Sequence, residues 1–176
     1  AANMLKVFAN DLTAKNRDAI LSKLGKEMSK EEKKLASYEK KAAGYQKSLD
    51  SYNKNLDKAQ QKNREATTNI EDTKVKIETS NNLIKEYSAS INPDNSDSAV
   101  KDALKSREKE QKKLDSYQKS LGGYQKTVES SAKDIEKNMK GKTKAENSLS
   151  GANKNVEKQR EIVRAKREAY KAVENQ

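Results

Sequence analysis

The chain contains no cysteine, histidine or tryptophan, and it has one proline and one phenylalanine in 176 residues. Without cysteine it can form neither disulfides nor thiolate metal sites. Without histidine it lacks the commonest general base and metal ligand. It also has no glycine-rich phosphate loop and no metal-ligand spacing. We therefore expect no catalytic site, no cofactor and no small-molecule substrate.

Apolar residues are also scarce. Only 32% of the residues are hydrophobic while 37% are charged, and the mean hydropathy is -1.21. This composition is too polar for a globular core of this size, and it leaves either a disordered chain or an elongated helical rod. No apolar run approaches the roughly 18 residues that a membrane-spanning helix needs.

A heptad repeat runs along the chain before Pro93 and resumes after it. Before the proline, the a positions are Leu35, Ala42, Leu49, Leu56, Asn63, Ile70, Ile77, Ile84 and Ile91, and the d positions are Tyr38, Tyr45, Tyr52, Ala59, Ala66, Thr73, Ser80 and Tyr87. After it, the a positions are Val100, Arg107, Leu114, Leu121, Val128, Ile135, Lys142, Leu149, Val156, Val163 and Tyr170, and the d positions are Ala103, Glu110, Tyr117, Tyr124, Ser131, Asn138, Ala145, Ala152, Gln159, Lys166 and Val173. Repeats of this length indicate coiled-coil helices and exclude disorder.

The single break between the two repeats has the composition of a turn. Pro93 cannot continue a helix and moves Asn92 out of the helical region. The residues that follow it favour turns and helix N-caps: Asp94, Asn95, Ser96, Asp97 and Ser98. A continuous helix that dimerises through both repeats would have to run straight through Pro93. The sequence therefore predicts an all-α fold, a long antiparallel two-helix coiled-coil hairpin with helices at 29–91 and 99–176 and a tip at 92–98.

Pairing the two arms about residue 94 places large side chains opposite small ones. Tyr38 and Tyr45 then face the region of Ala145 and Ala152, and the tyrosines of the second arm face Ala66 and Thr73. Because the tyrosines occupy a and d positions, we interpret them as packing residues and expect no specific binding of nucleic acid.

The first 28 residues are denser in apolar side chains than the rest of the chain. Gly25 is a candidate C-cap, and residues 29–32 have the form of a capping box that opens the long helix. We therefore expect one or two short amphipathic helices at 1–28, packed at the base of the hairpin near Val163, Tyr170 and Val173. The residues predicted to make this contact, with the hairpin, a partner or lipid, are Leu5, Phe8, Leu12, Ile20 and Leu24.

This layout resembles the N-terminal coiled-coil domain of the invasin-type hydrophobic translocators of bacterial type III secretion. The resemblance is carried by the tip, where residues 90–95 read Ser-Ile-Asn-Pro-Asp-Asn. Ile70-Glu71-Asp72, Lys76-Ile77 and the start MLKVFANDL are also similar. One departure is Ser96, which stands where a second proline is usual in the family.

The resemblance implies a secreted bacterial protein that acts at a host or target cell membrane and helps to deliver effectors. It implies protein partners, namely a chaperone, another translocon component or a receptor. The tip residues expected to contact a partner are Ile91, Asn92, Pro93, Asp94, Asn95, Ser96 and Asp97. The net charge of +11 adds a weak contact with anionic membranes.

Two other classes of protein remain open at this point. The receptor-binding rod of a bacteriocin is also a long helical hairpin, although the small and polar tip lacks the bulky aromatic side chains that such binding favours. An intracellular structural coiled coil is the third class. The genes downstream distinguish the first two, because a translocator requires apolar spans and a bacteriocin requires a killing domain.

Overall fold

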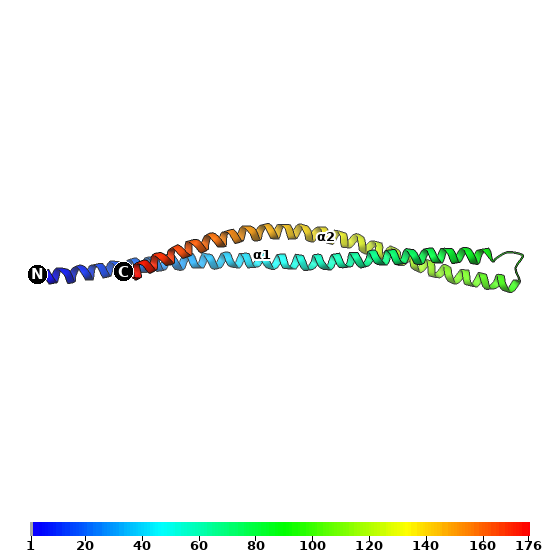
Figure 1. Ribbon diagram of the computed structural model, residues 1–176, viewed down its shortest axis with the longest axis horizontal. Coiled ribbons are helices and arrows are strands. Elements are labelled where there is room, and N and C mark those ends of the chain that lie inside the picture. The colour runs from blue at the N-terminus through cyan, green and yellow to red at the C-terminus, as the bar shows by residue number, and fades with distance from the viewer. Residues whose placement is uncertain (1) are drawn as a thin grey trace. The chain divides into compact units, whose positions relative to one another are not determined.

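Two long helices make up the protein. The structure, a computed structural model, describes residues 2–176, with side chains at 13–176. Helix α1 (Ala2–Ala89) and helix α2 (Asp97–Glu174) pack against each other and are joined by a turn (Figure 1). The chain is 95% helical, and the described residues contain no strand. The predicted all-α helical hairpin is confirmed.

The buried side chains follow the heptad repeat. Every buried residue among the described side chains occupies an a or d position of the repeat predicted from the sequence. The apolar ones are Leu56, Ala59, Ala66, Ala103, Leu114, Ala145, Ala152, Val156 and Val163, and the polar ones are Thr73, Ser80, Glu110, Ser131 and Gln159. The two helices therefore bury one narrow strip each, which is the packing of an antiparallel coiled coil.

The chain forms two compact units. The first, here called the terminal unit, contains the residues up to Ser51 together with Gly141–Gln176. The second, here called the tip unit, is Tyr52–Lys140 and includes the turn. Within each unit a segment of α1 packs against a segment of α2.

The separate short helices expected at 1–28 are not formed. Helix α1 runs through Gly25 without interruption, and no described residue has the positive φ that a glycine C-cap requires. Glycine costs about 1 kcal/mol in a helix interior, but Leu21, Leu24 and Met28 on either side of Gly25 continue the half-buried face of α1. A Cβ on Gly25 would lie 3.6 Å from Tyr170, so α1 does pack near Tyr170 as expected, but as part of the long helix.

The tyrosines of the terminal unit are less buried than the expected large-against-small packing requires. Ala145 and Ala152 are buried as expected, and Tyr38 is half-buried, but Tyr45 keeps 40% of its surface exposed. In the tip unit the agreement is better, since Tyr117 and Tyr124 are both half-buried and Ala66 and Thr73 are buried.

Polar side chains interrupt the apolar strip without being left unpaired. Asn63 donates from Nδ2 to Ser131 Oγ at 3.0 Å and to the Val128 carbonyl at 3.3 Å. Ser80 donates to Glu110 Oε1 at 2.8 Å. Among the described residues, no buried side-chain nitrogen or oxygen lacks a hydrogen-bond partner. Such cross-helix pairs fix which residues of the two helices lie side by side.

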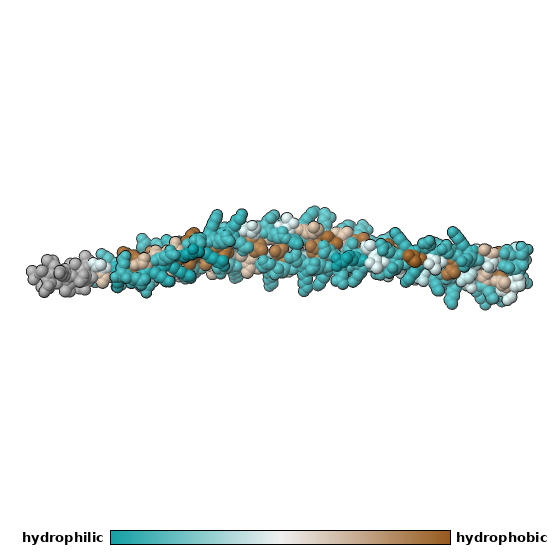
Figure 2. All heavy atoms as spheres, in the orientation of Figure 1, coloured by the Kyte–Doolittle hydropathy of each residue, from teal (hydrophilic) through white to brown (hydrophobic). Residues whose placement is uncertain are grey.

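The surface is dominated by charged and amide side chains. Figure 2 shows hydrophilic residues over most of the visible face, with apolar residues concentrated along the line between the helices. A few large apolar side chains nevertheless remain more than 40% exposed, among them Ile20, Val75 and Leu104.

Candidate functional site

The turn that joins the helices holds its conformation by its own hydrogen bonds. Helix α1 ends in a tightened turn, in which the N–H of Ser90 donates to the Tyr87 carbonyl and that of Ile91 donates to the Ser88 carbonyl. Asn92 closes the helix end, because its Nδ2 donates to the Ala89 carbonyl at 3.0 Å. The last carbonyls of α1 thus find partners where Pro93 prevents another helical turn.

The proline sits at the second position of a β-turn. The N–H of Asn95 donates to the Asn92 carbonyl at 3.3 Å, so residues 92–95 form the turn. None of these four residues has a positive φ, which makes this a type I turn, the type in which proline at that position is favoured. The Asn92 side chain also accepts a hydrogen bond from the Asp94 N–H at 2.9 Å, and Asn95 Nδ2 donates to the Ser90 carbonyl at 2.6 Å.

Ser96 stands directly before helix α2 and caps its N-terminus. Its Oγ accepts a hydrogen bond from the Ala99 N–H at 3.2 Å, and its carbonyl accepts one from the Val100 N–H at 3.0 Å. This is the geometry of an N-cap. Asp97 lies in the first turn of α2, where a negative charge interacts favourably with the helix dipole. The residue that departs from the translocator pattern therefore has a defined structural role.

The predicted tip residues are contiguous: Ile91 to Ser96 form the loop, and Asp97 is the first residue of α2. Ile91 and Asn92 are half-buried, while the remaining five, Pro93, Asp94, Asn95, Ser96 and Asp97, are exposed. The tip thus presents a small polar surface on a backbone that is already ordered.

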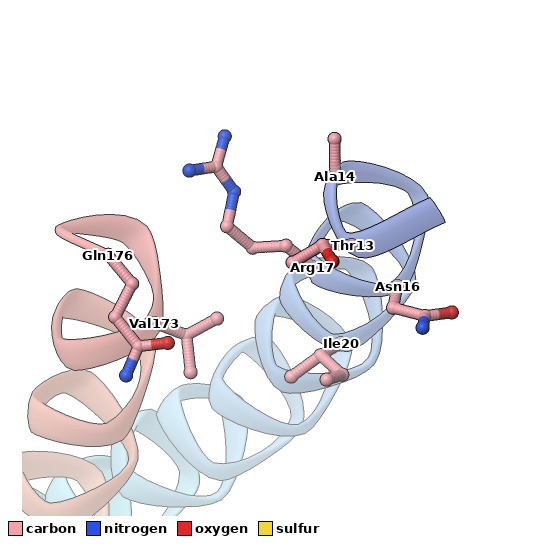
Figure 3. A pocket seen from close by; sticks show the side chains of 7 residues that line it. All are labelled: Thr13, Ala14, Asn16, Arg17, Ile20, Val173 and Gln176. Carbon is pink, nitrogen blue, oxygen red and sulfur yellow. The ribbon is translucent and has the colours of Figure 1, made fainter. Parts of the chain in front are cut away.

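The predicted N-terminal contact residues are only partly described. Leu5, Phe8 and Leu12 lie in α1, but their side chains fall outside the described residues. Leu24 is half-buried, and Ile20 is 49% exposed. Ile20 lines an open groove of about 370 Å³ between the two helices, opposite Val173 and close to Arg17 (Figure 3). The other residues that line it are Thr13, Ala14, Asn16 and Gln176.

Acidic residues of α1 pair with basic residues of α2 across the terminal unit. Glu27 lies 3.2 Å from Lys166, and Glu32 lies 3.2 Å from Arg167. A third pair joins Glu39 and Arg160 at 3.8 Å. In all three pairs the acidic residue belongs to α1 and the basic residue to α2.

Gln159 adds a hydrogen-bonded contact to this series. Its Nε2 donates to Glu31 Oε2 at 2.6 Å and to the Glu31 carbonyl at 2.9 Å. The hydrogen bond from Gln159 holds the pKa of the Glu31 carboxyl below its usual value, and nearby Lys34 and Lys30 lower it further, against a smaller opposing effect of burial. The heptad spacing identified Gln159 as a d residue. It did not predict that Glu31 would be its hydrogen-bond partner.

The described part of the chain holds no group of three His, Cys, Asp or Glu residues that could bind a metal ion. None of its described helices is long and apolar enough to cross a membrane. Comparison of the chain with protein-family models, curated proteins and solved structures found no match. What the geometry offers is therefore an ordered polar tip and an open groove near the ends of the helices.

Proposed function

We propose that this protein is a non-enzymatic helical hairpin that acts through protein–protein contact, as the coiled-coil domain of a secreted bacterial translocator. The observation that carries the proposal is the tip. Residues 90–95 have the sequence pattern of that family, and their side chains are the ones whose hydrogen bonds build the loop.

The order of the tip supports a role in binding. A loop that is ordered before binding loses little conformational entropy when a partner docks, so more of the contact energy appears as affinity. Pro93 and Asp94 on this loop and Asp97 at the start of α2 are exposed and are available to a partner. We propose that the partner is a second translocon component, a chaperone or a host receptor.

The chemistry of the tip favours this function over that of a bacteriocin rod. Binding hot spots are enriched in tryptophan, tyrosine and arginine, and residues 91–97 contain none of these. A contact that uses hydrogen bonds and the charges of Asp94 and Asp97 suits a reversible assembly step. Anionic membranes form a weaker secondary partner through the net charge of +11, and salt screens that attraction.

The test uses the full gene product in the bacterium that encodes it. Release of the protein into the medium is measured in strains with and without a working type III export ATPase. We expect release only when the ATPase works. Retention inside the cell, or release that does not depend on the ATPase, would overturn the proposal.

Contact-dependent lysis of host cells then tests the tip. Asp94→Lys should reduce lysis without changing export, because it reverses a charge on the exposed loop. The matched control is Asp102→Lys, which makes the same change at an exposed position of α2 outside the tip. Equal lysis by both variants would exclude the tip as the contact surface. Receptor-dependent killing of neighbouring bacteria in place of host-cell lysis would support the bacteriocin alternative.

A further inference from the structure

Contacts between the helices show which heptad positions share a side of the terminal unit. Glu32 of α1 pairs with Arg167 of α2 at 3.2 Å, and both occupy e positions, four residues after an a position. Where the e positions of an antiparallel pair meet along one side, the g positions meet along the other. Ile20 and Gln176, both at g positions, line one groove (Figure 3). The b and e positions therefore form one side of this unit, and the c and g positions form the opposite side.

The side formed by the c and g positions of residues 13–51 and 141–176, here called the lysine side, carries almost no negative charge. It holds one acidic residue, Glu27, which pairs with Lys166 at 3.2 Å. Its basic residues are all lysines and all exposed: Lys23, Lys30, Lys34, Lys41, Lys144 and Lys158. No described residue forms an ion pair with any of the six. The lysine side thus presents six positive charges without an ion-pair partner.

The opposite side, formed by the b and e positions of the same residues, has the reverse balance. Its acidic residues outnumber its basic ones by seven to five. The acidic ones are Asp18, Glu32, Glu39, Asp50, Glu146, Glu157 and Glu174, and the basic ones are Lys15, Arg160, Arg164, Arg167 and Lys171. The f positions, at the outer edges, carry Lys26, Lys33, Lys40 and Lys47 on α1 and Lys154, Glu161 and Glu168 on α2. The positive charge of the unit is therefore concentrated on the lysine side and along the outer edge of α1.

Two exposed isoleucines lie among the lysines of the lysine side. Ile20 keeps 49% of its surface exposed and Ile162 keeps 43%. Because Ile20 lies level with Gln176, Lys34 comes level with Ile162 two heptads further along the pair. Exposed alanines continue the apolar surface on α2: Ala165, Ala169 and Ala172. The lysine side thus combines separated positive charges with aliphatic side chains, and its c and g positions include neither arginine nor an aromatic residue.

An anionic bilayer is the partner that suits these features. Lysine side chains place their ammonium groups among lipid phosphates while their stems cover apolar surface, and aliphatic side chains beside them are buried in the headgroup region. Nucleic acids are bound largely through arginine forks and aromatic stacking, and the lysine side offers neither. Since the two helices lie side by side, a flat surface can touch the c and g positions of both, while the b and e positions point away from it.

We propose that the terminal unit lies flat on anionic phospholipid, with the lysine side against the headgroups and with Ile20 and Ile162 at the boundary between headgroups and acyl chains. This inference rests on the weak membrane contact of the proposed function and assigns it to one side of one unit, which the net charge alone does not do. Each lysine near an anionic surface strengthens binding about fivefold, and salt weakens the attraction.

Sedimentation of the chain with lipid vesicles tests the lysine side. The vesicles are phosphatidylcholine with or without phosphatidylserine, at about 0.1 M salt, where the screening length of about 10 Å is close to the diameter of a helix. Lys41→Gln with Lys158→Gln should weaken binding to phosphatidylserine vesicles roughly 20-fold. The matched control, Lys15→Gln with Lys171→Gln, has the same net charge and also changes one exposed lysine on each helix, but on the opposite side, and should weaken binding less than about threefold.

The outcomes separate this inference from the proposed function. Equal weakening by the two double variants would overturn the lysine side and leave a membrane contact that depends on net charge alone. No binding of the natural chain to phosphatidylserine vesicles would overturn the membrane contact together with its assigned side. Neither result bears on the export test, and circular dichroism checks that the variants remain helical.

A fluorescent label reports which side faces the lipid, because the natural sequence has no cysteine and single cysteines can be introduced. Ser37→Cys places the label at a c position on the lysine side, and Ser22→Cys places it at a b position on the opposite side of the same helix; both serines are exposed. Vesicle binding should protect the label at residue 37 from quenching by acrylamide several-fold more than the label at residue 22. Equal protection would overturn the proposal.

An apolar substitution distinguishes lipid from nucleic acid. Ile162→Ser should weaken vesicle binding several-fold, since the isoleucine then no longer enters the headgroup region. Val75→Ser is the control, because Val75 is 63% exposed and lies outside the terminal unit. Equal vesicle binding by these two variants would overturn the place assigned to Ile162. Tighter binding of the natural chain to a DNA duplex than to phosphatidylserine vesicles, at equal phosphate concentration and salt, would overturn the choice of lipid as the partner.

Discussion

Ser80 and Glu110 meet at d positions of the tip unit, where the serine hydroxyl donates to Glu110 Oε1 at 2.8 Å. Both residues are buried, at 1% and 8% exposure. The second carboxylate oxygen lies 3.9 Å from Lys113. The Glu110 carboxylate is tolerated in the packed strip because both of its oxygens have partners. The Ser80–Glu110 hydrogen bond also joins α1 to α2 at this point of the tip unit.

Removing one partner of this pair should be more costly than removing both. Ser80→Ala leaves the Glu110 carboxylate short of a donor, and we expect a loss of about 1–3 kcal/mol in the free energy of unfolding. Ser80→Ala combined with Glu110→Leu should recover the loss or exceed the stability of the natural chain, because two apolar side chains then meet. Urea denaturation measures all three proteins, and a double variant weaker than Ser80→Ala would contradict this account.

The pairing of the helices within one chain can be tested by an engineered disulfide. Asn63 Nδ2 and Ser131 Oγ are 3.0 Å apart. Asn63→Cys with Ser131→Cys should therefore form a disulfide that leaves the chain at monomer mass on a non-reducing gel. A continuous helix dimerising through both repeats would give covalent dimers instead. Asn63→Cys with Gln125→Cys is the control, since Gln125 is exposed and lies outside the packed strip.

Two glycines in the terminal unit offer a test of helix propensity. A Cβ at Gly25 would lie 3.6 Å from Tyr170, an ordinary contact, and a Cβ at Gly151 would meet nothing within 4 Å. Gly25→Ala and Gly151→Ala should each raise the free energy of unfolding by about 1 kcal/mol. Thermal denaturation checks the result, and a decrease at Gly25 would mean that Tyr170 packs more tightly on α1 than the structure indicates.

Acid should weaken the terminal unit partly through Glu31. Its pKa in the folded protein lies below the ordinary value of 4.5, chiefly because Gln159 donates a hydrogen bond to the carboxylate. A lowered folded pKa contributes stability above the unfolded pKa, and that contribution is lost as the pH falls through the folded pKa. Glu31→Gln should therefore flatten the decrease of melting temperature below about pH 4.5, while Glu168→Gln, on the exposed face of α2, should not.

The heptad repeat allowed the fold to be predicted, because the residues that a two-helix structure buries are drawn from two positions in every seven. It correctly identified buried Leu114, Val163 and even Glu110. The N-terminal part of α1 was harder to predict. Gly25 and the capping-box residues 29–32 suggested a break, but α1 runs through them, and Leu21, Leu24 and Met28 continue its half-buried face.

The sequence predicted the tip, but it did not predict the polar contacts between α1 and α2. The tip was found because Pro93 and the residues after it specify a turn by local chemistry alone. The partners of Glu31, Glu32 and Glu39 could not be found in the same way, since they lie more than one hundred residues away and depend on the register.

The last prediction concerns Ser96 and tests whether this tip residue stabilises the fold by capping α2. Ser96 caps α2 through its hydroxyl, so Ser96→Ala should lower the free energy of unfolding by about 1 kcal/mol, whereas Ser98→Ala, at an exposed neighbouring position, should change it little. Ser96→Asp should preserve stability, because aspartate is an equally good N-cap and its charge suits the helix N-terminus. Urea denaturation of the three variants measures these differences. If Ser96→Ala and Ser98→Ala were equally stable, the hydroxyl of Ser96 would not cap the helix, and its place in the tip would have to be explained by partner contact alone.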